Sequence, residues 1–171
     1  MDVEKIRMTF RPPKTCVLFV GESPPAGGTF FYIGNSTLAR YTQEGFSQAY
    51  GMEFKNTNEF LKSFMKNGFY LEDLCQIPVN NMDGSSRRRT HKDSVEEFTK
   101  RLKEIDPRAV ITILVSIKRH VEKALLTAGL ANIPHYVLPF PAMSHQQRYV
   151  VELSKVLHEL HGKGIILGSM N

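Results

Sequence analysis

An uninterrupted apolar segment near the N-terminus, ending at a glycine, constrains the fold more than any other feature of the chain. Residues 15–20 (T-C-V-L-F-V) are β-prone and lack the alternation of a half-exposed strand, and Gly21 follows them directly. This pattern is typical of a strand that is buried on both faces of a parallel sheet. The segment therefore predicts an α/β protein.

Strand-like and helix-like segments alternate along the rest of the chain. We expect further strands at residues 69–74, 109–114 and 135–138, and helices from 35 or 36 to about 50 and at 56–68, 94–106, 116–128 and 146–160. Such alternation implies right-handed crossovers and a parallel sheet with helices on both faces. The predicted fold class is a three-layer α/β/α sandwich around a central four-stranded parallel sheet.

Local signals mark the starts of two helices and one long loop. Asn56 with Glu59 and Ser94 with Glu97 have the spacing of capping boxes, in which two side chains satisfy the first free amides of a helix. Between residues 78 and 92 the chain is polar, which predicts a long loop. This loop would carry three consecutive arginines, Arg87, Arg88 and Arg89.

Length and composition predict a single cytoplasmic domain that spans residues 1–171. The chain is 42% apolar and 23% charged, it has no apolar run of the roughly 18 residues that cross a membrane, and its start lacks a signal-peptide core. Cys16 and Cys75 are too few for a disulfide framework and have no metal-site spacing, so no metal site is expected. A formal net charge of +5 favours an anionic partner such as nucleic acid.

Ligands of an open parallel sheet bind beyond the carboxyl ends of the strands, where the strand order reverses. This rule would bring together residues 21–32, 73–81, Ser116 and 140–148. In the first of these segments, G-E-S-P-P-A-G-G, prolines stiffen the loop and glycines allow the backbone to approach a ligand, so that the carboxylate of Glu22 is placed in advance. The loop is neither a P-loop nor a dinucleotide-binding fingerprint.

The loop Gly21, Glu22, Ser23, Pro24 and Pro25 resembles the uracil-DNA glycosylase superfamily, and in particular the branch that carries Gly-Glu-Ala-Pro-Gly. The resemblance extends over residues 15–160. It implies the fold of that superfamily, with strand order 2-1-3-4, and a monomer that acts on DNA. It implies no cofactor, because the four cysteines of the iron–sulfur members are missing.

The resemblance also implies roles for residues of the expected crevice. Glu22 would orient a water molecule and oppose positive charge on the sugar. Phe31, with Phe30 and Tyr32 as neighbours that could serve instead, would stack on a flipped base unless these rings belong to the core. Further candidates for contact with the base are Ser23, Tyr32, Asp73 and Ser116, and candidates for contact with DNA are Arg87, Arg88, Arg89, Met143 as a wedge, Ser144 and Arg148.

Two positions depart from the motifs of the superfamily. Asp73 stands where the relatives have the Asn that contacts the pyrimidine edge. An ionised carboxylate accepts hydrogen bonds but donates none, so it could accept from uracil N3–H but would repel O4. Leu138 stands where the relatives have a His that stabilises the departing base, which leaves His145, seven positions further on, as the candidate to replace it.

Three functions from different classes are therefore open. The first is a DNA glycosylase that hydrolyses the N-glycosidic bond of uracil or another deaminated base. The second is a catalytically weakened DNA- or nucleotide-binding member of the same fold, which Leu138 and Asp73 favour. The third is a small-molecule nucleoside hydrolase or transferase, in which Glu22 would be the acid or base. Salt-dependent binding to DNA separates the first two from the third, and cleavage separates the first from the second.

Overall fold

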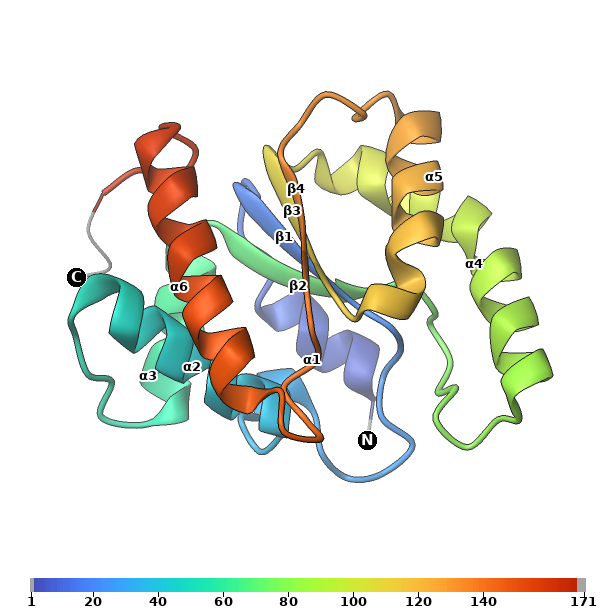
Figure 1. Cartoon of the computed structure of the whole chain (residues 1–171), viewed down its shortest axis with the longest axis horizontal. Helices are drawn as coiled ribbons and strands as arrows, with labels where there is room; N and C mark the ends of the chain where they lie inside the picture. The colour runs from blue at the N-terminus through green and yellow to red at the C-terminus, as the bar shows by residue number, and fades with distance from the viewer. Residues whose placement is uncertain (1, 169–171) are drawn as a thin grey trace.

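Four parallel strands form one sheet at the centre of the computed structural model, which describes residues 2–168 (Figure 1). The strands are β1 (Val17–Gly21), β2 (Phe69–Asp73), β3 (Ala109–Ile113) and β4 (His135–Leu138). Every residue of β1, β2 and β3 is buried, whereas most of the edge strand β4 is only partly buried. The predicted α/β class and the sheet order 2-1-3-4 are confirmed.

Helices cover both faces of this sheet and complete a three-layer arrangement. Helices α2, α3 and α6 lie on one side, and α4 and α5 pack together on the other (Figure 1). The helices are α1 (Val3–Thr9), α2 (Thr37–Tyr50), α3 (Thr57–Lys66), α4 (Gly84–Ile105), α5 (Lys118–Ala128) and α6 (Gln146–Gly162), with short 3-10 helices η1 (Phe31–Ile33) and η2 (Val115–Ile117). Within residues 2–168, none of the helices has the length and apolar character needed to cross a membrane.

The starts of α2 and α3 lie where the capping residues predict them. The Ser36 hydroxyl accepts a hydrogen bond from the Ala39 amide at 3.1 Å, and the Asn56 side chain accepts one from the Glu59 amide at 3.0 Å. The Glu59 carboxylate bonds to the Lys55 amide instead of the Asn56 amide, so the second half of the capping box is shifted by one residue. Each helix thereby satisfies amides that its first turn leaves free.

The start of α4 contradicts the prediction from sequence. The expected loop over residues 78–92 ends at Asp83, whose carboxylate caps the helix by accepting from the amides of Ser85 and Ser86. The capping box expected at Ser94 is wrong, because that residue lies in the middle of the helix. The error has a physical cause. The first turns of α4 are mostly exposed, so they carry no apolar periodicity, and the buried stripe becomes visible only from Val95 onward.

A buried hydrogen bond joins α2 to α6. The hydroxyl groups of Thr42 and Tyr149 lie 2.8 Å apart, and both residues are fully buried. One turn along α2, Gly45 permits close approach of the two helices, because a Cβ atom there would lie only 2.7 Å from Cδ2 of Leu153. Water is therefore excluded from the hydroxyl pair, and each group depends on the other for its hydrogen bond.

We expect Thr42→Val to lower the free energy of unfolding by about 1–3 kcal/mol, because it leaves the Tyr149 hydroxyl buried without a partner. Urea denaturation measures this change. The control is the double variant Thr42→Val with Tyr149→Phe, which removes both polar groups and should cost less than the sum of the two single changes. Additive losses would show that the hydrogen bond does not couple the two residues.

Candidate functional site

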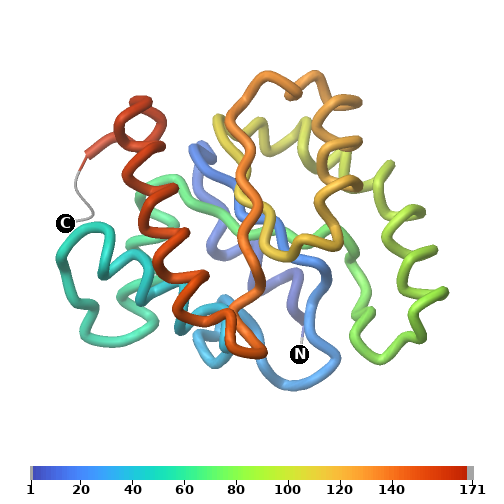
Figure 2. Tube along the Cα trace, viewed as in Figure 1, coloured from blue at the N-terminus to red at the C-terminus, as the bar shows by residue number. Residues whose placement is uncertain are grey.

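A cavity of about 600 Å³ lies beyond the carboxyl ends of the strands. Its lining comes from the segments that follow all four strands, together with Leu38 of α2 and Arg87 of α4. Figure 2 shows that the segments after β1 and β4, which are far apart in sequence, run along the same lower side of the molecule. The segments that the parallel-sheet rule brings together therefore do share one cavity.

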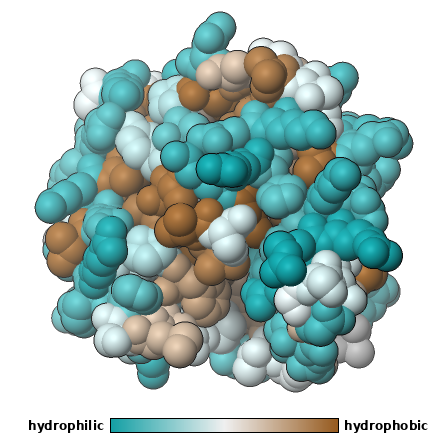
Figure 3. All heavy atoms as spheres, turned by 45° about the vertical axis from the view of Figure 1, so that its right-hand side comes forward, coloured by the Kyte–Doolittle hydropathy of each residue, from teal (hydrophilic) through white to brown (hydrophobic). Residues whose placement is uncertain are grey.

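Exposed apolar side chains border this cavity. Val115, Phe140 and Met143 all line it and are exposed, Met143 to 87%. Figure 3 shows one face of the molecule on which apolar side chains gather in a continuous area surrounded by hydrophilic ones. Apolar surface next to a cavity with polar groups is typical of a binding site.

A second, smaller cavity of about 200 Å³ adjoins the first. The two share the lining residues Ser23, Asp73 and Phe140, among others. Phe31 lines only the smaller cavity and is 3% exposed, with its ring edge-on to Tyr32 and Phe60. The aromatic ring that borders the larger cavity is therefore that of Phe140, which follows β4, and not that of Phe31 from the first loop.

The carboxylate of Glu22 lines the large cavity and is held from α4. Arg87 donates from Nε to Oε1 at 2.6 Å and from a terminal nitrogen to Oε2, and Nε2 of His91 lies 2.8 Å from Oε1. The hydrogen bond with Glu22 also raises the pKa of Arg87. A carboxylate has about four acceptor positions, two on each oxygen. These three contacts fill Oε1 and leave one position on Oε2.

Arg87 and His91 reach Glu22 because α4 begins earlier than expected. The two residues are four positions apart, and such residues lie on one face of a helix, one turn apart. His91 is buried and its ring also meets that of His120 edge-on, with centroids 5.6 Å apart. His91 is not among the site residues predicted from sequence, because the polar segment 78–92 that contains it predicts a loop. The spacing of Arg87 and His91, four positions apart, could have indicated a shared helix face.

Asp73, at the end of β2, is the second carboxylate that lines the cavity, and it is only 5% exposed. Arg7 of α1 forms ion pairs with Oδ2 of Asp73 and with Glu72. Arg101 of α4 bonds to Glu72 at 2.8 Å and to the carbonyl oxygen of Asp73 at 2.9 Å. Burial raises the pKa of Asp73 to about 6, and the charge of Arg7 opposes part of that rise.

Gly21 provides the space that Asp73 occupies. A Cβ atom built on Gly21 would collide with Oδ1 of Asp73. The register of the sheet pairs these two residues directly across β1 and β2. The glycine of the first loop is therefore needed for the second carboxylate to reach the cavity.

Strained backbone is concentrated at the same cavity. Among residues 2–168, four residues other than glycine have positive φ angles, and three of them are here: Leu114 (φ 128°), Met143 (φ 50°) and Ser144 (φ 68°). Leu114 and Met143 line the cavity, and Ser144 follows directly. Such conformations cost about 1–3 kcal/mol each and occur preferentially at functional sites.

The structure brings some of the predicted site residues together and leaves others elsewhere. Tyr32 lines neither cavity, because its hydroxyl is buried against the backbone of Leu71, where it accepts from the amide at 2.6 Å. Arg148 pairs with Glu152 on the surface of α6. Those that line the large cavity are Glu22, Ser23, Asp73, Arg87, Ser116, Met143 and His145, whereas Arg88, Arg89 and Ser144 are exposed outside it.

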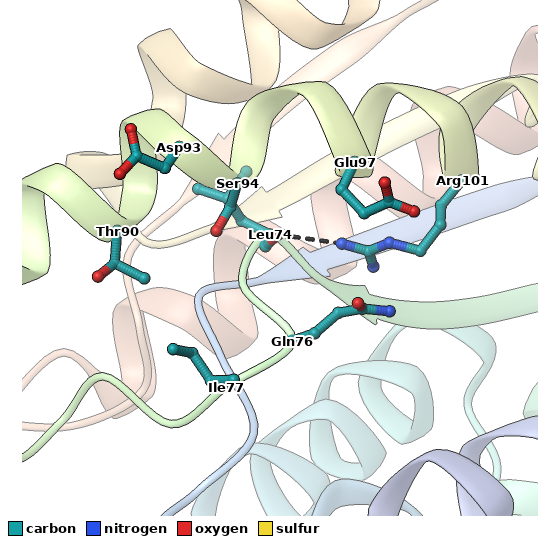
Figure 4. Close-up of a pocket in the computed structure, with 8 residues that line it drawn as sticks. All are labelled: Leu74, Gln76, Ile77, Thr90, Asp93, Ser94, Glu97 and Arg101. Atoms are coloured by element: carbon teal, nitrogen blue, oxygen red, sulfur yellow. Dashed lines mark hydrogen bonds between the residues drawn. The ribbon is translucent and has the colours of Figure 1, made fainter.

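A separate hollow of about 380 Å³ lies between α4 and the segment that follows β2 (Figure 4). It shares no lining residue with the cavity of Glu22. Figure 4 shows Arg101 extending across it to the carbonyl oxygen of Leu74, to which it donates at 3.0 Å. This arginine thus supports the end of β2, and it is not among the residues predicted from sequence to belong to a site.

A scan against models of protein families and a search of curated proteins both found no match for this chain. The resemblance described from residues 21–25 therefore stays a prediction. The features of the chain that bear on function are the cavity, its two carboxylates and the arginines that hold them.

The pKa of Asp73 predicts a pH-dependent stability. Because the folded-state pKa of about 6 lies above the ordinary value of 3.8, the folded protein holds this proton more tightly than the unfolded chain does. The protonated Asp73 therefore contributes roughly 3 kcal/mol to the free energy of unfolding below about pH 4, and this contribution is lost as the pH rises through about 6.

The variant Asp73→Asn has no titrating group at this position and is the matched comparison. Urea denaturation of both proteins between about pH 4 and pH 7 gives the difference in their free energies of unfolding. We expect the advantage of the wild type to shrink as the pH rises. A difference that is independent of pH would contradict the raised pKa.

Proposed function

We propose that this chain is a DNA glycosylase that acts as a monomer and hydrolyses the N-glycosidic bond of a damaged base. The observation that carries the proposal is the position of Glu22, 14% exposed at a cavity large enough for a base and held in one orientation by Arg87 and His91. A net charge of +5 supports an anionic substrate.

In the proposed reaction, a water molecule hydrogen-bonded to Oε2 of Glu22 adds to C1′ of the sugar. The bond between C1′ and the base nitrogen breaks, and its electron pair leaves with the base. The negative charge of Glu22 stabilises the cation-like sugar, and its free acceptor position takes the proton that the water loses. A clamped carboxylate suits this role because it need not reorganise during the reaction.

The departing base requires stabilisation of negative charge or a proton. Leu138 is buried at the end of β4 and supplies neither. His145 lines the cavity at the N-terminal end of α6, and Ser116 lines it from η2. We assign to these two side chains the contacts with the base as it leaves.

Binding to DNA is assigned to the surface around the cavity. Arg88 and Arg89 are exposed on the first turns of α4, next to the position of Arg87. Met143 projects from the cavity rim and suits the space that a flipped nucleotide leaves in the stack. Phosphate contacts of this kind release counterions, so affinity should fall with increasing salt.

One observation favours the alternative of a DNA- or nucleotide-binding protein without catalysis. Three of the four acceptor positions of Glu22 are already occupied, which leaves little capacity to act on a water molecule. Leu138, which stands where the resemblance places a histidine, also favours this non-catalytic alternative. Cleavage of DNA decides between the two functions.

The decisive experiment is incubation of the protein with DNA duplexes that each carry one altered base, followed by alkali to reveal abasic sites. The series contains uracil, hypoxanthine, xanthine, methylated cytosine and methylated guanine. We expect cleavage by the wild type and a loss of at least about 100-fold in Glu22→Gln. Glu104→Gln, an exposed carboxylate of the same helix as Arg87, is the control and should retain activity.

Two negative outcomes have different meanings. DNA binding that weakens with salt, without cleavage of any duplex, would support the non-catalytic alternative. Failure to bind DNA at all would overturn both the glycosylase and the non-catalytic DNA-binding protein, and would leave the small-molecule nucleoside hydrolase or transferase.

His91 should act as a positioning residue for Glu22. We expect His91→Leu to lower kcat by about 10- to 100-fold with little change in KM, because the carboxylate loses a contact that fixes its orientation. His91→Gln retains an N–H donor and should recover most of the activity. Equal losses in both variants, with unchanged thermal stability, would show that this hydrogen bond has no role in the reaction.

A further inference from the structure

The side chain of Asp73 has one oxygen that the protein does not use. Oδ2 pairs with Arg7, whereas Oδ1 has no hydrogen-bond partner among residues 2–168. The residue lines both the 600 Å³ cavity and the adjoining 200 Å³ cavity, although it is only 5% exposed. A nearly buried acceptor at the boundary of two cavities is placed to bind a donor group of a ligand.

The charges around Asp73 keep its carboxyl group ionised at neutral pH. Arg7 contacts it directly, and Arg101 neutralises the neighbouring Glu72. Burial raises the pKa to about 6, which is still below neutrality. The ligand therefore meets a carboxylate, which accepts hydrogen bonds and cannot donate them.

This restriction discriminates between base edges. An exocyclic amino group donates to a carboxylate, whereas a carbonyl oxygen at the same position would face it as a second acceptor. With a carbonyl oxygen at that position, two hydrogen-bond acceptors would face each other, and both would be buried without a donor. This repulsion adds to the selectivity that the bond to an amino group provides.

We propose that Asp73 selects a base that presents an exocyclic amino group, and that it disfavours a base with a carbonyl oxygen at that position. The inference rests on the proposed function in so far as that function places a base in this cavity. It narrows the substrate to damaged bases that keep their amino group, and it disfavours the deaminated bases that the family resemblance implies. Phe140, which lines both cavities, offers its ring to the face of such a base.

Binding of deoxynucleosides tests this selection without requiring catalysis. Dissociation constants at about pH 7 are measured by NMR titration of the full chain for two matched pairs, deoxycytidine with deoxyuridine and deoxyadenosine with deoxyinosine. The first member of each pair carries an exocyclic amino group where the second has a carbonyl oxygen, and the adjacent ring nitrogen is an acceptor in the first and an N–H donor in the second. We expect the amino-bearing member to bind about 10-fold more tightly, which corresponds to about 1.4 kcal/mol.

Two variants separate the role of Asp73 from the mere loss of one negative charge from the protein. In Asp73→Asn, an amide that both donates and accepts replaces the carboxylate, and we expect the preference to reverse towards deoxyuridine. In Asp93→Asn, an exposed carboxylate of α4 that lines neither cavity is neutralised, and the preference should persist.

The outcomes distinguish this inference from the proposed glycosylase activity. Preference for amino-bearing nucleosides without cleavage of DNA would retain the inference and overturn the activity. Cleavage of uracil-containing DNA with tighter binding of deoxyuridine would retain the activity and overturn the inference. Three further results would overturn the inference: equal affinities within each pair, no measurable binding of any deoxynucleoside, or an unchanged preference in Asp73→Asn.

Discussion

The interaction on which the site depends is the buried ion pairing of Arg7 with Glu72 and Asp73 at the end of β2. Two adjacent carboxylates in the interior would each lose several kcal/mol of hydration without a partner. Arg7 and Arg101 supply the compensating charge from α1 and α4, two elements that meet the strand from different parts of the chain. The ion pairs therefore connect three elements and fix Asp73 against Gly21.

Helix α4 supports both carboxylates of the cavity. Its first turns hold Glu22 through Arg87 and His91, and its last part holds the end of β2 through Arg101. The apolar stripe that starts at Val95 anchors the helix on the sheet. One rigid element thus sets the distance between an acidic group of the loop after β1 and one at the end of β2, which is the kind of support that a preorganised site requires.

The arrangement gives the cavity a consistent chemical character. Among the residues that the structure describes, none fills the last acceptor position of Glu22 or bonds to Oδ1 of Asp73, so both carboxylates favour ligand groups that donate hydrogen bonds. Much of the surrounding wall is apolar, and it includes the strained residues Leu114 and Met143. Under the proposed function, a water molecule and an amino-bearing base would satisfy these acceptors, whereas the O4 carbonyl of uracil would not satisfy Asp73.

The sequence by itself determined the strands, most helices, and the loops that meet at the cavity, because apolar runs, capping residues and the rule for parallel sheets are local or topological signals. The order of the strands was expected only from the resemblance to a known family, and the structure has that order. Only the tertiary structure decided the start of α4, the partners of Glu22 and Asp73, and the burial of Phe31 and Tyr32. Arg7 and Glu72 are 65 positions apart, as are Glu22 and Arg87. Ion pairs at such separations leave no pattern along the chain, and an exposed helical turn carries no apolar periodicity, so packing alone determines both.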